Sequence, residues 1–97
     1  MLYLVNKSPV STNSLASVLR IATAGTPILF YEDGVYAAMP GTRVTETVKA
    51  ALADRPLYAL EADLKARGIH AVIKGIQVID YDGFVELVEQ HDVVPWL

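Results

Sequence analysis

The chain has 97 residues, 53% of them hydrophobic, and a formal net charge of −3. That length allows one small domain with a modest core, and its eight lysine and arginine residues are too scattered to form the basic stripe that nucleic-acid binding requires. Cysteine is absent from the sequence, so the chain forms no disulfide and offers no thiolate nucleophile.

Signals for membrane insertion and export are also missing from the sequence. No apolar stretch approaches the roughly 20 residues of a membrane span. Residues 1–10 have neither the basic region nor the long apolar run of a signal peptide. We therefore expect a cytoplasmic protein that does not bind membranes.

The high apolar content allows two interpretations. Globular chains average about 45–50% apolar residues even when glycine is counted among them. The excess is explained by a sheet whose strands are buried on both faces, or by surplus apolar surface that partner subunits cover. The composition alone favours neither.

The N-terminal part of the chain predicts a strand, a helix and a second strand. Residues 2–5 are an apolar run followed by a polar loop, which is typical of a buried strand. Ser11–Asn13 supplies N-cap candidates for a helix that we expect to end at Gly25. Its inner face holds Leu15, Val18, Leu19 and Ala22. Residues 27–31 are the most β-prone run and predict the second strand.

Two helical segments follow in the middle of the chain. Residues 35–39 predict one or two helical turns, which Pro40-Gly41 ends. A second full helix then begins at Thr42 or Thr45 and stops before Pro56.

The C-terminal part predicts two strand and helix pairs. Residues 57–60 form a short strand, and the helix over 61–68 has acids in its first turn, bases in its last turn and Gly68 at its end. Residues 75–79 form the next strand. The last helix is capped by Asp80 or Asp82 and turns Phe84, Leu87 and Val88 inward. No helix or strand is expected over residues 93–97.

The alternation of strands and helices predicts the fold class. Strands that alternate with helices favour a parallel sheet with right-handed crossovers. The sequence has no repeat, linker or low-complexity segment. We expect one α/β domain over residues 1–97, a three-layer sandwich with a mostly parallel sheet of about four or five strands and helices on both faces.

No group of residues predicts a catalytic, cofactor or metal site. Asp33, Asp80 and Asp82 are better explained as turn and cap residues than as a phosphate-accepting cluster. His70 and His91 have no neighbouring Cys or His at ligand spacing. The interpretation of the chain as a small hydrolase has no support beyond the presence of Ser, His and Asp.

The loop after the first strand is the best candidate for a ligand site. Its polar residues are Ser8, Ser11, Thr12, Asn13 and Ser14. They lead into a helix N-terminus, whose free N–H groups can hold an anion. The loop has no glycine and no dinucleotide or Walker fingerprint. Ordinary helix capping is therefore the simpler interpretation, and an independent domain that binds a flavin, nucleotide or anion is the alternative.

Five segments together resemble the TusB/DsrH family. They are Leu4–Pro9, Glu32–Ala38, Tyr58–Gly68, Ile79–Val85 and Trp96-Leu97. They follow in order over nearly the whole chain, and the series is more specific than any of its pieces. The resemblance implies a DsrE-like fold and a hetero-oligomer, paired as a hexamer, with paralogues similar to TusC/DsrF and TusD/DsrE.

The resemblance also implies a function in sulfur transfer. It indicates a non-catalytic subunit of a cytoplasmic sulfurtransferase complex, which serves either 2-thiolation of the tRNA wobble uridine or dissimilatory sulfur oxidation. The main sulfur-accepting cysteine of such complexes belongs to the TusD/DsrE subunit. Some relatives also carry a cysteine in the first helix, where the corresponding residue here is Val18. Persulfide chemistry needs a thiolate, so this position is expected to pack in the core.

We expect partner contacts at two places. One is the loop of Asp33 and Gly34 with nearby Tyr36, and the other is the tail Trp96-Leu97. Chain ends usually fray, so an apolar tail either packs on its own domain or anchors in a partner, as aromatic residues of interface cores do. We also expect the isolated chain to self-associate or to be poorly soluble.

Overall fold

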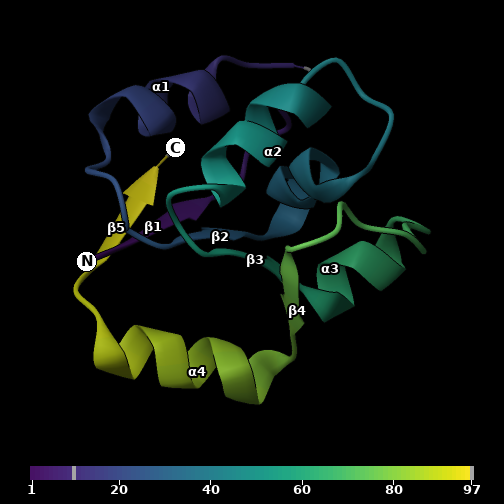
Figure 1. Ribbon diagram of the computed structural model, residues 1–97. Helices are drawn as coiled ribbons and strands as arrows, with labels where there is room; N and C mark the ends of the chain where they lie inside the picture. Colours follow the sequence, from purple (N-terminus) through teal and green to yellow (C-terminus); the bar gives the residue numbers. More distant parts are fainter. Residues whose placement is uncertain (10, 97) are drawn as a thin grey trace.

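A parallel β-sheet runs through the middle of the molecule in the computed structural model, which describes residues 1–9 and 11–96 (Figure 1). Within these residues the strands are β1 (Leu2–Val5), β2 (Ile28–Phe30), β3 (Leu57–Leu60), β4 (Gln77–Ile79) and β5 (Val93–Trp96). The helices are α1 (Ser14–Ile21), the 3-10 helix η1 (Glu32–Ala38), α2 (Thr45–Leu52), α3 (Glu61–Ala66) and α4 (Tyr81–Gln90). The strand order is β4-β3-β2-β1-β5.

The strand β1 lies between β2 and β5 and is buried along its whole length. Its residues pair in register with both neighbours, Leu4 for example with Leu29 on one side and Pro95 on the other. All four strand pairs are parallel, which confirms the predicted fold class. Full burial of β1 and β2 accounts for part of the high apolar content.

Helices cover the two faces of the sheet unequally. On one face, α1, η1, α2 and α3 enclose a large core, whereas α4 crosses the other face (Figure 1). The first core includes Val18 from α1, Val35 from η1, Val48 from α2 and Leu64 from α3. The second core is smaller and places Leu87 of α4 against Leu2, Leu4 and Leu29 of the sheet.

Several predicted helix ends are confirmed. Asp80 caps α4, because its Oδ1 accepts a hydrogen bond of 2.9 Å from the N–H of Gly83. Gly68 has a φ of +67° directly after α3, and its N–H donates to the carbonyl of Lys65 at 3.1 Å. Of the two possible starts of the middle helix, the structure selects Thr45.

Other predicted boundaries are wrong. The helix α1 ends at Ile21 because Ala22 is already extended, so Gly25, with a φ of +88°, shapes the turn that follows instead of capping the helix. Val88 was expected to face inward but is 37% exposed. Residues 93–96 form the edge strand β5, although no element was expected there. An edge strand tolerates Pro95, which lacks an N–H to donate.

None of the helices in residues 1–9 and 11–96 has the length and apolarity needed to span a bilayer.

Candidate functional site

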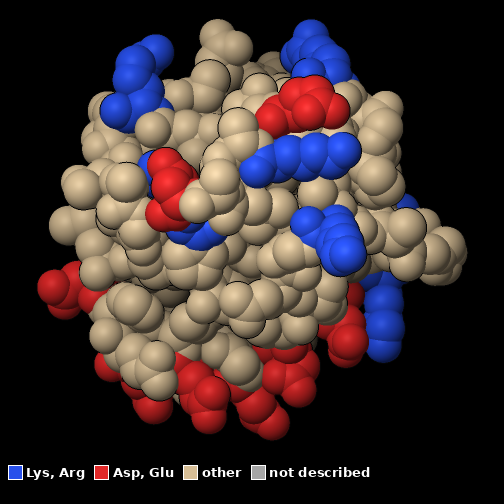
Figure 2. Space-filling model, viewed as in Figure 1, with Lys and Arg blue, Asp and Glu red and all other residues tan. Residues whose placement is uncertain are grey.

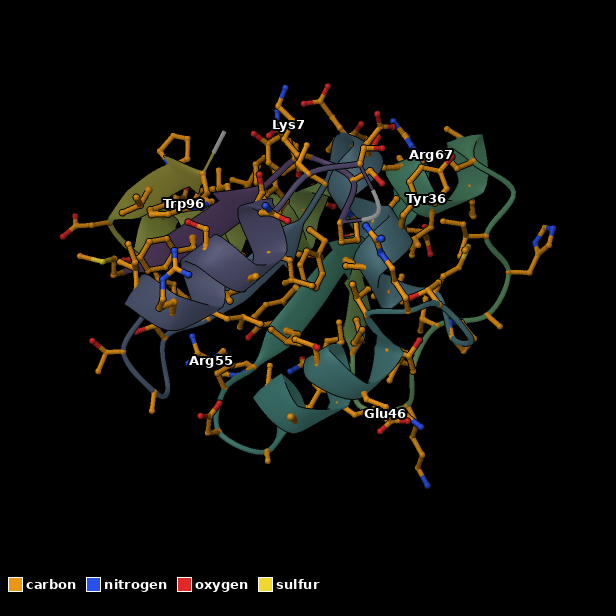
Figure 3. The ribbon with its side chains drawn as sticks, turned by 90° about the horizontal axis from the view of Figure 1, so that it is seen from above. Lys7, Tyr36, Glu46, Arg55, Arg67 and Trp96 are labelled. Carbon is orange, nitrogen blue, oxygen red and sulfur yellow. The ribbon has the colours of Figure 1, made fainter. Side chains whose placement is uncertain are left out.

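The carboxyl ends of all five strands meet at one edge of the sheet. Ligands of open α/β sheets bind at this edge, and the residues that directly follow β1 to β4 there are Asn6, Tyr31, Glu61 and Asp80. The predicted contact residues Asp33 and Trp96 both lie near this edge. Since β1 separates β2 from β5, the structure does not bring the two residues together. Figure 3 shows Trp96 on one side and Tyr36 with Arg67 on the other, with Lys7 between them.

Asp33 is tied to α3 of its own chain. Its Oδ1 lies 2.9 Å from Nη2 and 2.9 Å from Nε of Arg67. The same guanidinium donates from Nη1 to the carbonyl of Asp63 at 3.2 Å. The Oδ2 of Asp63 in turn accepts a hydrogen bond of 2.7 Å from the N–H of Glu32. These bonds hold the start of η1 against α3, and sequence reasoning missed them because Asp33 and Arg67 are 34 positions apart.

Gly34 is buried against the end of β1. A Cβ atom at this position would overlap the carbonyl oxygen of Val5 and stand 2.9 Å from its carbonyl carbon. The N–H of Gly34 donates to the carbonyl of Tyr31 at 2.9 Å. Glycine is therefore needed here for space, so that η1 can approach the sheet.

The backbone is strained at the junction between β2 and η1. Glu32 has a φ of +48°, a region that non-glycine residues enter at a cost of roughly 1–3 kcal/mol. Burial raises the pKa of the Tyr31 phenol above 10.0, and the Glu32 carboxylate raises it further. The phenol is therefore neutral at physiological pH and is not an activated nucleophile. Backbone strain of this kind clusters at functional sites.

The C-terminal tail packs on its own domain. Trp96 is half-buried and meets Tyr3 edge to face, with ring centroids 5.7 Å apart and an interplanar angle of 73°. This arrangement is favourable for aromatic pairs. Leu97, the other tail residue of the predicted contact set, lies outside the described residues. Tyr36 is also half-buried and packs against the larger core.

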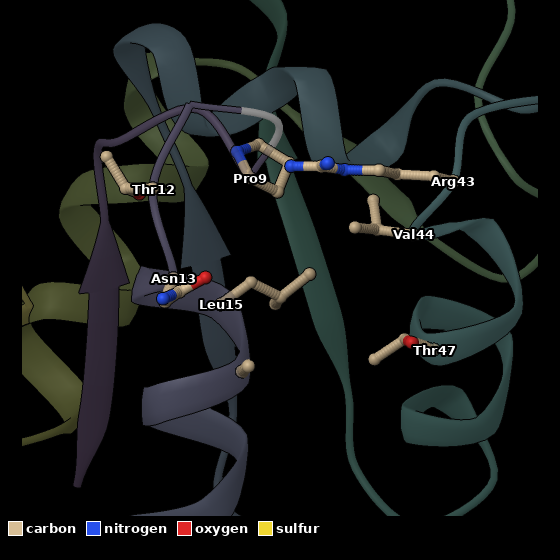
Figure 4. A pocket seen from close by; sticks show the side chains of 8 residues that line it. Pro9, Thr12, Asn13, Leu15, Arg43, Val44 and Thr47 are labelled. Carbon is tan, nitrogen blue, oxygen red and sulfur yellow. The ribbon is translucent and has the colours of Figure 1, made fainter.

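The loop after β1 borders a cavity of about 330 Å³ (Figure 4). Its lining residues are Pro9, Thr12, Asn13, Leu15, Ala16, Arg43, Val44 and Thr47. The hydroxyl of Thr12 donates to the carbonyl of Ser8 at 3.1 Å and accepts from the N–H of Ser14 at 3.3 Å. Asn13 occupies the N-cap position of α1 but makes no side-chain cap hydrogen bond. The Thr12 hydroxyl is thus used within the loop and at the start of α1, whereas the buried Oδ1 of Asn6 at the end of β1 has no hydrogen-bond partner within residues 1–9 and 11–96.

Sequence reasoning also missed Arg55, whose side chain is only 5% exposed. Its Nη2 donates to the carbonyl of Ala22 at 3.4 Å, and its Nε to Oδ1 of Asp54 at 3.2 Å. Nη1 has no partner within residues 1–9 and 11–96. Arg55 therefore ties the C-terminal ends of α1 and α2 together, beside a cavity of about 380 Å³ that Leu19 also lines. The sequence around Arg55 contains no pattern that predicts a contact with Ala22, 33 positions away in the chain.

The described part of the chain holds no cluster of side chains that could bind a metal ion. No three or more His, Asp or Glu side chains there come together in a way that could hold a metal ion. His70 is exposed and His91 is half-buried.

Comparisons with known proteins cover almost the whole chain. A family model described as DsrH like protein matches residues 7–94. Protein TusB of Serratia proteamaculans is 42% identical over 93 residues, and Protein TusB of Escherichia coli K12 is 39% identical over 92 residues. Each of these alignments covers 94% of both chains.

Solved structures with little sequence identity share the fold. A protein of unknown function, MTH1491 of Methanobacterium thermoautotrophicum, aligns with a TM-score of 0.76 at 14% identity, over 97% of this chain and 96% of its own. The ychN protein of E. coli aligns with a TM-score of 0.75 at 18% identity, over 97% of both chains. This likeness concerns the arrangement of strands and helices alone.

Proposed function

The chain belongs to the DsrH-like family, and we propose on this basis that it is a non-catalytic subunit of a sulfur-relay complex. The observation that carries the proposal is its identity of about 40% with proteins named TusB over 94% of both chains. The absence of cysteine supports a structural part in the relay, because only a thiolate can accept and pass on persulfide sulfur.

The surroundings of Val18 also support a non-catalytic role for this chain. This residue stands where some family members have a cysteine, and it is fully buried in the core between α1 and the sheet. A side chain there packs and cannot meet a sulfur donor. We propose that a TusD-like partner supplies the reactive cysteine and that this chain helps to shape the site around it.

Of the two sulfur pathways, we propose 2-thiolation of tRNA wobble uridine. The matching curated relatives carry the name TusB, and TusB-type subunits belong to the tRNA branch of the family. The proposed partners are paralogous subunits of the TusC and TusD type. Tyr36, Trp96 and Asp33 are proposed to contact them, since each keeps exposed surface after its contacts within the chain are made.

Co-expression with the cysteine-bearing paralogues of the same genome tests the complex. We expect the three chains to co-purify and to give one defined assembly in native mass spectrometry, while the isolated chain self-associates or precipitates. A stable, soluble monomer that binds neither paralogue would contradict the proposal. Trp96→Ala and Tyr36→Ala should weaken the complex more than Lys49→Ala, which lies on exposed α2.

The cavity beside Thr12 is the one observation that favours a second function, the binding of a small anionic ligand near Arg43. Flavin mononucleotide, ATP and sulfate are suitable probes for a thermal shift assay. A shift of several degrees that Ser8→Ala and Thr12→Ala abolish would support this alternative. The hydrogen bonds within the loop lead us to expect no shift.

A further inference from the structure

The helix α4 carries an apolar stripe on its outer side. Tyr81, Val85 and Val88 are 58%, 50% and 37% exposed. Their spacing of four and three residues places them on one face of a helix. This stripe lies beside Leu87, which faces the sheet. The apolar surface of α4 is thus wider than the surface that the domain itself covers.

The same part of the chain has a one-sided charge. Residues 75–97 contain five acidic residues and no lysine or arginine, whereas residues 1–74 contain six acidic and eight basic residues. The five acids are Asp80, Asp82, Glu86, Glu89 and Asp92. Figure 2 shows acidic side chains gathered along the lower rim, where Figure 1 places α4.

The fold explains the positions of Asp80 and Asp82, at the cap and in the first turn of α4, but not those of the other acids. Asp80 caps the helix, but none of the five takes part in an ion pair within residues 1–9 and 11–96. Glu89 lies in the last turn of α4, where the helix dipole disfavours negative charge and where there is no base, and Glu86 lies just before that turn. By contrast, Lys65 in the last turn of α3 lies 3.6 Å from Glu61 in its first turn. Residues that conflict with the local helix preferences are expected mainly at functional sites.

We propose that the exposed surface of α4, which consists of the stripe of Tyr81, Val85 and Val88 with Glu86 and Glu89 along one side of it, docks a protein subunit that presents an apolar patch with basic side chains beside it. The proposal rests on the proposed function and names the surface and the partner's chemistry. A large exposed aromatic with adjacent aliphatic side chains provides the apolar centre of an interface. The flanking carboxylates select a positively charged partner and speed its association.

Charge argues against a second copy of this chain as the occupant. Two α4 faces that meet symmetrically would bring the same carboxylates together, because a twofold interface places one patch on itself. Like charges across an interface cost free energy. The surface therefore fits a paralogous subunit of opposite charge, on the side of the sheet away from η1.

Single substitutions with matched controls test the surface in the co-expressed complex. Glu86→Lys should weaken association about tenfold, and Val85→Ser about fivefold. Glu46→Lys on α2, where the side chain is 88% exposed, makes the same change of charge on the other side of the sheet. Ile21→Ser on α1, where the side chain is 57% exposed, is the control for Val85→Ser. Both controls should bind within about twofold of wild type.

Melting of the isolated variants separates docking from folding. Glu86→Lys replaces the like charge four residues after Asp82 by an opposite charge, so it should melt at or above the temperature of wild type. If the wild-type complex forms and both α4 variants bind like wild type, the docking surface is wrong and the sulfur-relay proposal stands. If the wild-type chain forms no complex at all, both are overturned. If the α4 variants abolish only self-association, the face is a homodimer contact and the proposal is wrong.

Discussion

The two faces of the sheet differ in how completely the chain covers them. On one face, α1, η1, α2 and α3 bury a continuous core that includes Val18, Val35 and Val48. On the other face, α4 buries Leu87 but leaves an apolar stripe and its three acids, Asp82, Glu86 and Glu89, exposed to solvent. The chain's own helices cover the first face, whereas the second keeps apolar and acidic surface exposed, and we propose that another subunit covers it.

The largest effect is expected where η1 meets the sheet on the covered face. Gly34→Ala should lower the free energy of unfolding by about 4 kcal/mol, because the new Cβ overlaps the Val5 carbonyl and backbone must move. Gly25→Ala is the control: it has a φ of +88° but open space around it, and should cost about 1–2 kcal/mol. Urea denaturation measures both. Similar losses for the two variants would refute the close packing at Gly34.

A pair of identical substitutions compares the two faces directly. Val18→Ala removes fully buried methyl groups from α1 and should cost about 2 kcal/mol of unfolding free energy. Val88→Ala on α4 removes a partly exposed side chain and improves helix propensity, so stability should change by less than about 0.5 kcal/mol. Equal losses in chemical denaturation would mean that α4 is as firmly packed as α1.

The link between η1 and α3 should contribute less. Arg67→Met removes the bonds to Asp33 and should cost about 1 kcal/mol, because the guanidinium is largely buried but the Asp33 carboxylate is exposed. Lys65→Met breaks the exposed pair with Glu61 and should change stability by less than about 0.5 kcal/mol. Thermal melting at low and high salt measures the stability loss of each variant. An Arg67→Met protein as stable as wild type would show that the link does not hold η1.

The smallest effect concerns alkaline pH on the α4 side of the sheet. Because the pKa of Tyr31 is raised in the folded state, the unfolded chain loses this proton first, and stability falls as pH rises above 10.0. Tyr31→Phe should reduce that loss, while Tyr81→Phe on the outer side of α4 should not. Stability measured on both variants from about pH 8 to about pH 11, which brackets the ordinary tyrosine pKa of about 10, provides the test. Equal alkaline losses in wild type and Tyr31→Phe would contradict the shift.

The fold could be predicted because its signals are local. Apolar runs that alternate with capped helical patterns indicate a parallel α/β sheet, and Asp80 and Gly68 mark helix ends by their own chemistry. The strand β5 could not be predicted, because it is short, contains Pro95 and is defined only by its pairing with β1. Val88 was misplaced because helical spacing does not say which part of a wide apolar arc faces the sheet.

The candidate site was predicted only in outline. The segment around Asp33 and Gly34 was predicted as a partner contact, but its bonds to Arg67 and its approach to Val5 were not foreseen, because they join residues far apart in the chain. The role of Arg55 depends on the carbonyl of Ala22, which no local pattern reveals. The choice of Asp33, Tyr36 and Trp96 as partner contacts remains a prediction.

The central claim is that this chain organises a sulfur-transfer site whose cysteine another subunit supplies. The most direct test is the 2-thiouridine content of tRNA in cells that lack their own TusB-type subunit and receive this chain with its paralogues. We predict that thiolation is restored, and that Cys→Ser in the TusD-like partner abolishes it without dissolving the complex. A complex that assembles but leaves tRNA unthiolated, with the partner's cysteine intact, would contradict the account.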